Sequence, residues 1–209
     1  MKEIILFIDD EETSRTLYGD TLGEIYGEEY IVEAIRPENK IPDMLLAIER
    51  YENVVSIVID EKLHVEVGTD YKGSQLVEAI RFSDPKLPLY ILTSEMGLIE
   101  PPFGSVEYII DKSKIEIPAY KAQCILLMRR HINSFNEIKS SRILRYDELL
   151  RKSINDQLTE AEIEEYEALD FLRIKKVFSN EVPFSSAELD KQEILISEIE
   201  LELKKLENE

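Results

Sequence analysis

The chain has 209 residues, with 44 acidic and 25 basic side chains, so its formal net charge is -19. Such an acidic chain is repelled by nucleic-acid phosphates and by anionic lipid, which argues against nucleic-acid and membrane partners. One cysteine excludes a disulfide within the chain, and no apolar run approaches the roughly 18 residues of a membrane span, so we expect a cytoplasmic protein.

Five short apolar runs in the first two-thirds of the chain predict β-strands. Three of them are nearly all apolar and rich in β-branched residues, as are strands that a parallel sheet buries on both faces. The runs cover residues 3–8 (EIILFI), 30–35 (YIVEAI), 54–59 (VVSIVI), 87–92 (LPLYIL) and 106–110 (VEYII).

Helical spacing of apolar residues predicts helices between these strands and after the last one. Thr13 and Ser74 are the expected N-caps of the first and third helices. Between the fourth and fifth strands, SEMGLIEPPFGS leaves room only for a degenerate helix or a loop. The alternation predicts an α/β fold, a doubly wound, five-stranded parallel sheet with helices on both faces. The expected helices cover residues 13–26, 42–50, 74–82 and 118–135.

From about residue 137 no strand-like run appears, so we divide the chain into a domain of residues 1–136 and a helical extension of residues 137–209. Helical segments are expected near residues 141–155, 160–178 and 186–206, and the second and third begin with capping boxes, Thr159–Glu162 and Ser185–Glu188. The last segment has two rows of residues at heptad spacing. This spacing predicts a short coiled coil over 186–206, which would join two copies of the chain or bind a partner helix. The alternative is a helix that packs on its own domain. The rows are Leu189, Ile196, Leu203 and Gln192, Ile199, Leu206.

Acidic, hydroxyl and ammonium groups end the predicted strands. In open parallel sheets the functional crevice lies outside the carboxyl ends of the strands, so we expect these groups to converge there. They are Asp9 and Asp10 after the first strand, Asp60 after the third, Thr93 after the fourth, and Asp111 and Lys112 after the fifth.

Clustered carboxylates cost free energy unless a cation neutralises them, and a hard divalent ion such as Mg²⁺ suits oxygen ligands. A metal-shielded Asp60 carboxylate could then attack a phosphoryl group, whose oxygens the metal, Thr93 and Lys112 would stabilise. Plainer readings remain open: Asp60 as the cap of a turn, the Asp9–Asp10 pair as the cap of the first helix, and Lys114 in place of Lys112.

In this order the residues resemble the receiver domains of two-component response regulators. Those domains have an acidic pair after strand one, a phosphoacceptor aspartate after strand three, Thr or Ser after strand four and Lys after strand five. Gly73, in DYKGSQLVEAIR, also matches the family's glycine before the third helix. The resemblance covers residues 1 to about 136 and implies a flavodoxin-like fold.

The resemblance also implies roles for the matching residues. Asp60 would be phosphorylated by a histidine kinase or a phosphotransfer protein. Asp10, Asp60 and the backbone carbonyl of Lys62 would bind Mg²⁺, with Asp9 helping directly or through water. Thr93 and Lys112 would contact the phosphoryl group.

The sequence departs from the family pattern at several places, including a longer span than usual from Asp60 to Gly73. His64 stands where Pro is usual, the fourth helix is nearly absent, and Ser113 replaces the usual Pro after the lysine. The switch aromatic is expected at Ile109, whereas Tyr108 is one place off and would face the other side of the strand.

The expected function is therefore phosphorelay signalling and not catalysis, with output through protein contacts of the helical extension. One alternative is a degenerate receiver that acts as a phosphorylation-independent interaction scaffold. The other is a metal-dependent phosphotransfer enzyme of the haloacid dehalogenase type, which needs D-x-D after strand one where this chain reads D-D-E.

Overall fold

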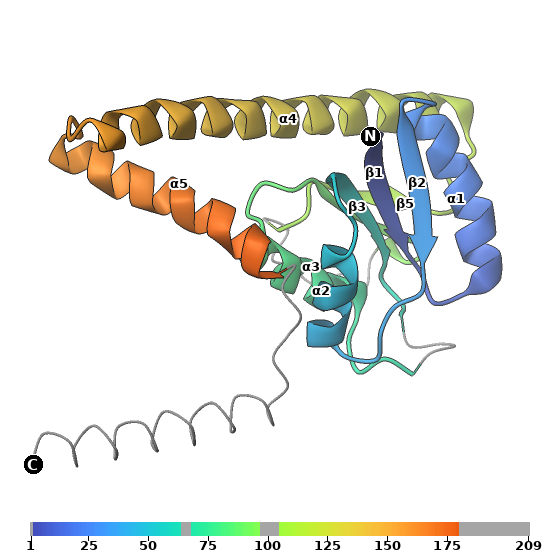
Figure 1. Cartoon of the computed structure of the whole chain (residues 1–209). Coiled ribbons are helices and arrows are strands. Elements are labelled where there is room, and N and C mark those ends of the chain that lie inside the picture. Colours follow the sequence, from blue (N-terminus) through green and yellow to red (C-terminus); the bar gives the residue numbers. More distant parts are fainter. Residues whose placement is uncertain (1, 64–67, 97–104, 180–209) are drawn as a thin grey trace, which may run out of the picture. The chain divides into compact units, whose positions relative to one another are not determined.

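The computed structural model describes residues 2–63, 68–96 and 105–179, and its centre is a five-stranded parallel sheet (Figure 1). All five predicted strands are confirmed: the first two have the predicted bounds, and the other three have ends shifted by one or two residues. The strand order is β2-β1-β3-β4-β5, the doubly wound order of the flavodoxin-like class. The strands are β1 (Glu3–Ile8), β2 (Tyr30–Ile35), β3 (Val54–Asp60), β4 (Leu89–Thr93) and β5 (Tyr108–Asp111).

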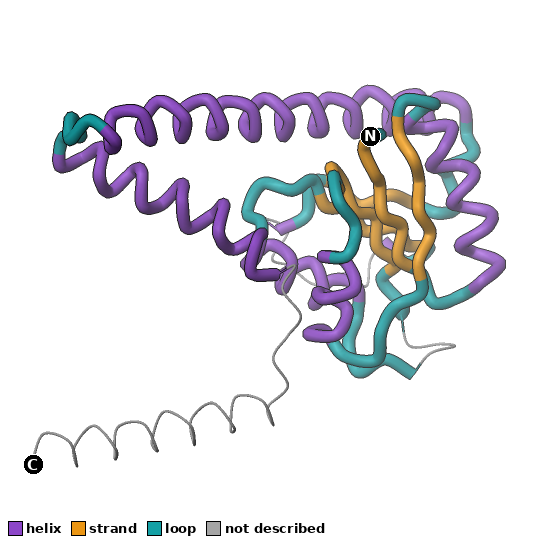
Figure 2. The backbone as a smooth tube through the Cα atoms, viewed as in Figure 1, coloured by secondary structure: helices purple, strands orange, loops and turns teal. Residues whose placement is uncertain are grey.

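Helices cover both faces of this sheet, as Figure 2 shows. α1 packs against the first half of α4, and α2 packs against α3. This is the arrangement that right-handed crossovers between parallel strands produce. The helices are α1 (Glu12–Tyr26), α2 (Ile41–Glu49), α3 (Gly73–Ser83), α4 (Pro118–Ile154) and α5 (Glu160–Ser179).

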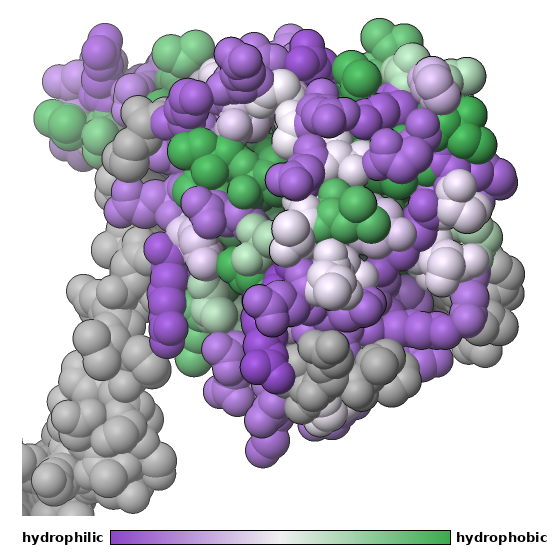
Figure 3. All heavy atoms as spheres, turned by 90° about the vertical axis from the view of Figure 1, so that its right-hand side faces the viewer, coloured by the Kyte–Doolittle hydropathy of each residue, from purple (hydrophilic) through white to green (hydrophobic). Residues whose placement is uncertain are grey.

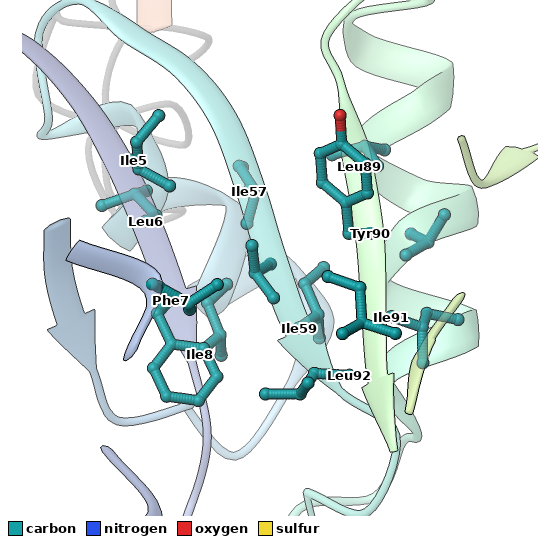
Figure 4. Packing of buried hydrophobic residues seen from close by; sticks show 14 of the residues in the cluster. Ile5, Leu6, Phe7, Ile8, Ile57, Ile59, Leu89, Tyr90, Ile91 and Leu92 are labelled. Carbon is teal, nitrogen blue, oxygen red and sulfur yellow. The ribbon is translucent and has the colours of Figure 1, made fainter. Parts of the chain in front are cut away.

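The core consists of the side chains of the three central strands and the helices that cover them. Phe7 of β1, Ile57 of β3 and Tyr90 of β4 are completely buried, and Figure 4 shows these and their neighbours packed beside one another. The edge strand β2 is only partly buried. Burial on both faces explains why the central strands lack the polar alternation of half-exposed strands.

Two predicted N-caps are wrong, because other groups begin those helices. Glu11 is the N-cap of α1, and the Thr13 hydroxyl donates a hydrogen bond to its side chain. Lys72 is the N-cap of α3, while the backbone N–H and hydroxyl of Ser74 donate to the Glu61 carboxylate. A carboxylate from the end of β3 thus meets the positive end of the α3 dipole.

The helices predicted over 118–135 and 141–155 form one continuous helix, α4. Residues 136–140 (NEIKS) contain neither glycine nor proline, so nothing in them ends a helix. The point near residue 137 after which no strand-like run appears therefore lies inside a helix. The domain division at residue 136 stays a prediction. α4 is held on the sheet domain as far as Asn136, whose side-chain N–H donates to Glu3 (3.0 Å).

The distal half of α4 folds back onto the start of α5 as a helical hairpin. The capping box is confirmed, since the Thr159 N–H donates to Glu162 (3.1 Å) and the Glu162 N–H donates to the Thr159 hydroxyl (3.4 Å). Tyr146 of α4 stacks on Tyr166 of α5, with ring centroids 5.5 Å apart. The predicted coiled coil over 186–206 and the capping box at 185–188 lie outside the described residues.

Apolar side chains reach the surface in separate patches on the face shown in Figure 3, which is the side of α1 and β2. Leu17 and Ile31 are among the exposed apolar residues. Isolated exposure of this kind is ordinary for a folded domain. Within the described ranges, none of the helices combines the length and the apolar character needed to cross a bilayer.

Candidate functional site

The predicted site residues converge at the carboxyl edge of the sheet. Parallel pairing places Asp60 opposite Leu92 and Thr93 opposite Asp111, so β3, β4 and β5 end side by side. The next residue, Lys112, continues the pairing through its backbone N–H, which donates to the Thr93 carbonyl (2.9 Å). Because the strands are parallel, residues far apart in the sequence reach the same edge.

Three buried carboxylates lie at the centre of this edge. Asp9, Asp10 and Asp60 are 1%, 2% and 6% exposed, and each offers a carboxylate oxygen within 4.8 Å of those of the other two. The Glu11 N–H donates to Asp9 (2.9 Å), and the Lys62 N–H donates to Asp60 (3.1 Å). Two of the three carboxylates are thus oriented by the backbone that follows them.

Lys112 supplies the positive charge of the site. Its Nζ lies 3.0 Å from Asp9 Oδ2 and 2.9 Å from Asp60 Oδ1. The ammonium also lies 5.0 Å from the ring centroid of Tyr18, a distance typical of a cation–π contact. Its rival Lys114 pairs instead with Asp111 and is more than half exposed, so Lys112 is the lysine of this site.

Burial dominates the ionisation of the two carboxylates that Lys112 contacts. Desolvation raises the pKa of Asp60 to about 6, although the ammonium of Lys112 opposes the shift. Burial likewise raises the pKa of Asp9. Burial alone would lower the pKa of Lys112, but the charges of Asp60 and Asp9 outweigh it and raise that pKa. The charge of Lys112 therefore does not fully offset the cost of burying these carboxylates in their ionised form. This remaining cost favours the binding of a further cation.

Thr93 and Lys62 border the carboxylates. Thr93 is buried, and its hydroxyl accepts a hydrogen bond from the Glu95 N–H (3.1 Å). The Lys62 side chain turns away from the acids and pairs with Glu95 (2.6 Å). The predicted metal ligand at Lys62 is its backbone carbonyl, and that role stays a prediction.

Gly73 lies directly behind the site. A β-carbon at this position would come within 2.2 Å of the backbone oxygen of Asp60, so no other residue fits without displacing the end of β3. The Gly73 N–H donates to the Glu61 carbonyl (3.1 Å), which ties the start of α3 to the residue after Asp60. The glycine singled out in the sequence is therefore required by a close backbone approach.

The structure describes some of the positions at which the sequence departs from the family pattern. Ile109 and Tyr108 are both partly buried in β5. The residues described between β4 and β5, 94–96 and 105–107, include no α-helix. His64 and residues 97–104 lie outside the described ranges. Asp9, Asp10, Asp60 and Lys112 thus lie close together although the neighbouring sequence departs from the family pattern.

Sequence reasoning missed two residues of the site. Arg15 donates hydrogen bonds to the carbonyls of Asp9 and Asp10 (both 2.8 Å), which fixes the turn that presents the acidic pair. Tyr18 provides the ring beside Lys112. Both residues are on the first turns of α1, and only the contact of this helix with the strand ends identifies them.

The donor set fits a hard divalent cation such as Mg²⁺. Carboxylate oxygens are the preferred ligands of Mg²⁺, which commonly needs only one or two of them with water completing its shell. Asp9, Asp10 and Asp60 provide such oxygens within reach of one ion. The site can therefore combine a metal with an acceptor carboxylate, a lysine and a hydroxyl, which are the groups that phosphoryl transfer requires.

No protein-family model matches the sequence, and no curated protein matches it. Solved structures do match. NtrX from Brucella abortus in complex with ADP is 19% identical, with a TM-score of 0.50, covering 73% of this chain and 33% of that chain. A second structure of NtrX from Brucella abortus is 20% identical, with a TM-score of 0.50, 70% coverage of this chain and 30% of that chain.

The response regulator protein TrrA from Thermotoga maritima, in complex with Mg²⁺ and BeF, is 19% identical, with a TM-score of 0.45, covering 59% of this chain and 98% of that chain. The chain spans about a third of the length of the NtrX structures. The likeness to the two NtrX structures, at 19% and 20% identity, shows a shared fold. It confirms the fold that the resemblance of the sequence implies.

Proposed function

We propose that this chain, whose fold is that of response-regulator receiver domains, accepts a phosphoryl group on Asp60 in a two-component phosphorelay. The observation that carries the proposal is the position of Lys112, whose ammonium lies within 3.0 Å of both Asp9 and Asp60. A lysine held between the acidic pair and a strand-end aspartate is the arrangement that transfer to Asp60 needs.

The residues divide the chemistry between them. Bound Mg²⁺, held by Asp9, Asp10, Asp60 and the Lys62 carbonyl, would neutralise the charge of the incoming phosphoryl oxygens. An Asp60 carboxylate oxygen would attack phosphorus, so a P–O bond forms while the P–N bond of a donor phosphohistidine breaks and its electron pair returns to the imidazole. Lys112 and the Thr93 hydroxyl would hold the transferred group.

The proposed donor is a histidine kinase or a histidine phosphotransfer protein, which would present a phosphohistidine at the carboxyl edge of the sheet. Output would pass through protein contacts of the helical extension, residues 137–209, and a homodimer through residues 186–206 remains part of the proposal. The acidic composition argues against binding to nucleic acid and to anionic membrane, and the single cysteine supports a cytoplasmic protein.

Incubation with acetyl phosphate and Mg²⁺, followed by intact-mass measurement, tests the proposal. We expect a mass gain of one phosphoryl group in the native chain and none in Asp60→Ala. Asp111→Asn is the matched control, since Asp111 is also a buried strand-end acid but pairs with Lys114 outside the cluster. Labelling that persists in Asp60→Ala would refute Asp60 as the acceptor.

The alternative function is a phosphorylation-independent scaffold. It is favoured by one observation: the residues described between β4 and β5 include no α-helix. Beryllofluoride with Mg²⁺ separates the two functions. A phosphorylatable site binds the complex, whereas a scaffold does not. Continuous turnover of a phosphate ester, in place of stoichiometric labelling, would instead indicate an enzyme of the haloacid dehalogenase type.

A further inference from the structure

The distal half of α4 has two faces of different character. Tyr146 and Leu149 are buried on the face toward α5. On the opposite face, Leu144 and Ile154 are 70% and 75% exposed. A helix that binds another protein surface through one face carries apolar side chains along that face.

The exposed face is a stripe with coiled-coil spacing. Leu144, Asp147, Arg151 and Ile154 follow one another at intervals of three, four and three residues, which places them along one line of the helix. All four are exposed. Along the stripe, the four residues are thus apolar, acidic, basic and apolar, in that order.

The two charges in this stripe differ from the other charges of the same helical segment. Arg145 pairs with Glu148 and Glu165, and Lys152 pairs with Glu162, so these groups belong to the hairpin. In the part of the chain that the structure describes, neither the Asp147 carboxylate nor the Arg151 guanidinium has a hydrogen bond or an ion pair, although one helical turn separates them.

We infer that this stripe binds the same stripe of a second copy of the chain, with the two α4 helices antiparallel. The sequence supports this occupant because the stripe is complementary to itself when reversed. Leu144 and Ile154 lie equally far on either side of Leu149, and so do Asp147 and Arg151.

A two-fold axis at the level of Leu149 therefore places Leu144 opposite the partner's Ile154, and Asp147 opposite the partner's Arg151. Each unpaired charge gains an opposite charge, and each exposed apolar side chain is covered by another. A parallel pairing would instead place Asp147 opposite Asp147 and Arg151 opposite Arg151, which is repulsive. The stripe thus specifies both the partner and its direction.

Charge reversal in the full chain tests the pairing, with the dissociation constant measured by sedimentation equilibrium. Asp147→Arg places two pairs of arginines opposite one another, and Arg151→Asp places two pairs of aspartates opposite one another. Each single variant should weaken the dimer about tenfold or more. The double variant Asp147→Arg/Arg151→Asp should regain the native dissociation constant.

Mixing the two single variants is the decisive measurement. In a heterodimer of Asp147→Arg with Arg151→Asp, every charge again faces its opposite, so the mixture should associate as tightly as the native chain. Rescue in the mixture requires contact between two copies, because a pair within one helix cannot be restored by a second chain. Failure of the mixture to recover would overturn the antiparallel pairing.

Leu144→Lys should also weaken the dimer, while Leu126→Lys is its matched control, because Leu126 is 75% exposed on α4 but outside the stripe. A native chain that stays monomeric overturns the inference. So does a dimer unaffected by both charge reversals, which would place the contact elsewhere, for example in residues 186–206. None of these readouts depends on phosphorylation of Asp60.

Discussion

Gly73 and Asp60 are in direct backbone contact: a β-carbon on Gly73 would lie 2.2 Å from the Asp60 carbonyl oxygen and 2.9 Å from its carbonyl carbon. The start of α3 is therefore pressed against the end of the strand that carries the proposed phosphoacceptor. This contact links the stability of the fold to the position of the Asp60 side chain.

Gly73→Ala should therefore lower the free energy of unfolding by roughly 2–4 kcal/mol, because the clash is with backbone that has no free rotamer to relax. Urea unfolding measures the change. Gly23→Ala is the control, since a β-carbon there meets nothing within 4 Å and Gly23 lies inside α1. That variant should be neutral or more stable by up to about 1 kcal/mol. Equal effects of the two substitutions would contradict the close approach.

Asp60→Asn should stabilise the metal-free chain at neutral pH. Burial raises the pKa of Asp60 from 3.8 to about 6, so the folded chain holds this proton more tightly than the unfolded chain. Above pH 6, ionised Asp60 therefore lowers the free energy of unfolding by up to about 3 kcal/mol. This loss of stability disappears as the pH falls from 6 to below 4. We expect a gain of about 1–3 kcal/mol at pH 8 that vanishes near pH 4.

Urea unfolding in the presence of a chelator, at several pH values, measures this dependence. Asp111→Asn should change the stability in the opposite direction, because hydrogen bonds from Ser113 hold the pKa of Asp111 below its ordinary value. Its ionised form stabilises the fold, so that variant should lose stability at neutral pH. A gain in Asp60→Asn that is the same at pH 4 and pH 8 would rule out the charge as its cause.

Lys112→Met should have two opposite effects. Without Mg²⁺, loss of the ammonium leaves Asp9 and Asp60 facing each other, and the free energy of unfolding should fall by about 2–4 kcal/mol. The affinity for Mg²⁺ should rise several-fold to about tenfold, because a positive charge next to the metal position has been removed. Calorimetric titration and unfolding with and without Mg²⁺ measure both changes.

Lys114→Met is the control for this variant, since the Lys114 side chain is more than half exposed and pairs with Asp111, outside the carboxylate cluster. Its stability should change by less than about 1 kcal/mol, with no change in Mg²⁺ affinity. Weaker Mg²⁺ binding in Lys112→Met than in the native chain would show that the metal site lies elsewhere.

Asp10→Asn and Lys62→Ala should separate side-chain ligands from backbone ligands. Asp10→Asn removes a carboxylate of the buried cluster, so Mg²⁺ affinity should fall about 10- to 100-fold. Lys62→Ala keeps the backbone carbonyl and removes only an exposed pair with Glu95, so the affinity should stay within a few-fold. Equal losses of Mg²⁺ affinity in both variants would disprove the assignment at Lys62.

The positions of the site residues were predictable because they depend on strand order and strand ends alone. Once the runs ending at Asp9, Asp60, Thr93 and Lys112 are identified as parallel strands, convergence at one edge follows from the geometry of the sheet. Lys112 was also the lysine predicted from the sequence, and the structure supports it over its rival Lys114, which pairs with Asp111.

The features that sequence reasoning missed depend on contacts between distant segments. Ser74 has the chemistry of an N-cap, but Glu61 reaches the start of α3 from the end of β3, and no local pattern reports that. The continuity of α4 was missed for another reason: its apolar face changes partner near Asn136, from the sheet domain to α5, while its helix-forming residues continue.

Because α4 runs unbroken from its docked half into the hairpin, it can act as a lever. The stretch from Glu137 to Ile154 extends about 27 Å past the last anchor on the sheet domain, at about 1.5 Å per residue. A rigid rod of that length turns a tilt of about 5° at its base into a displacement of about 2 Å at its far end. Small rearrangements beside β5 would thus produce larger displacements at the far end of α4, where the chain turns into α5.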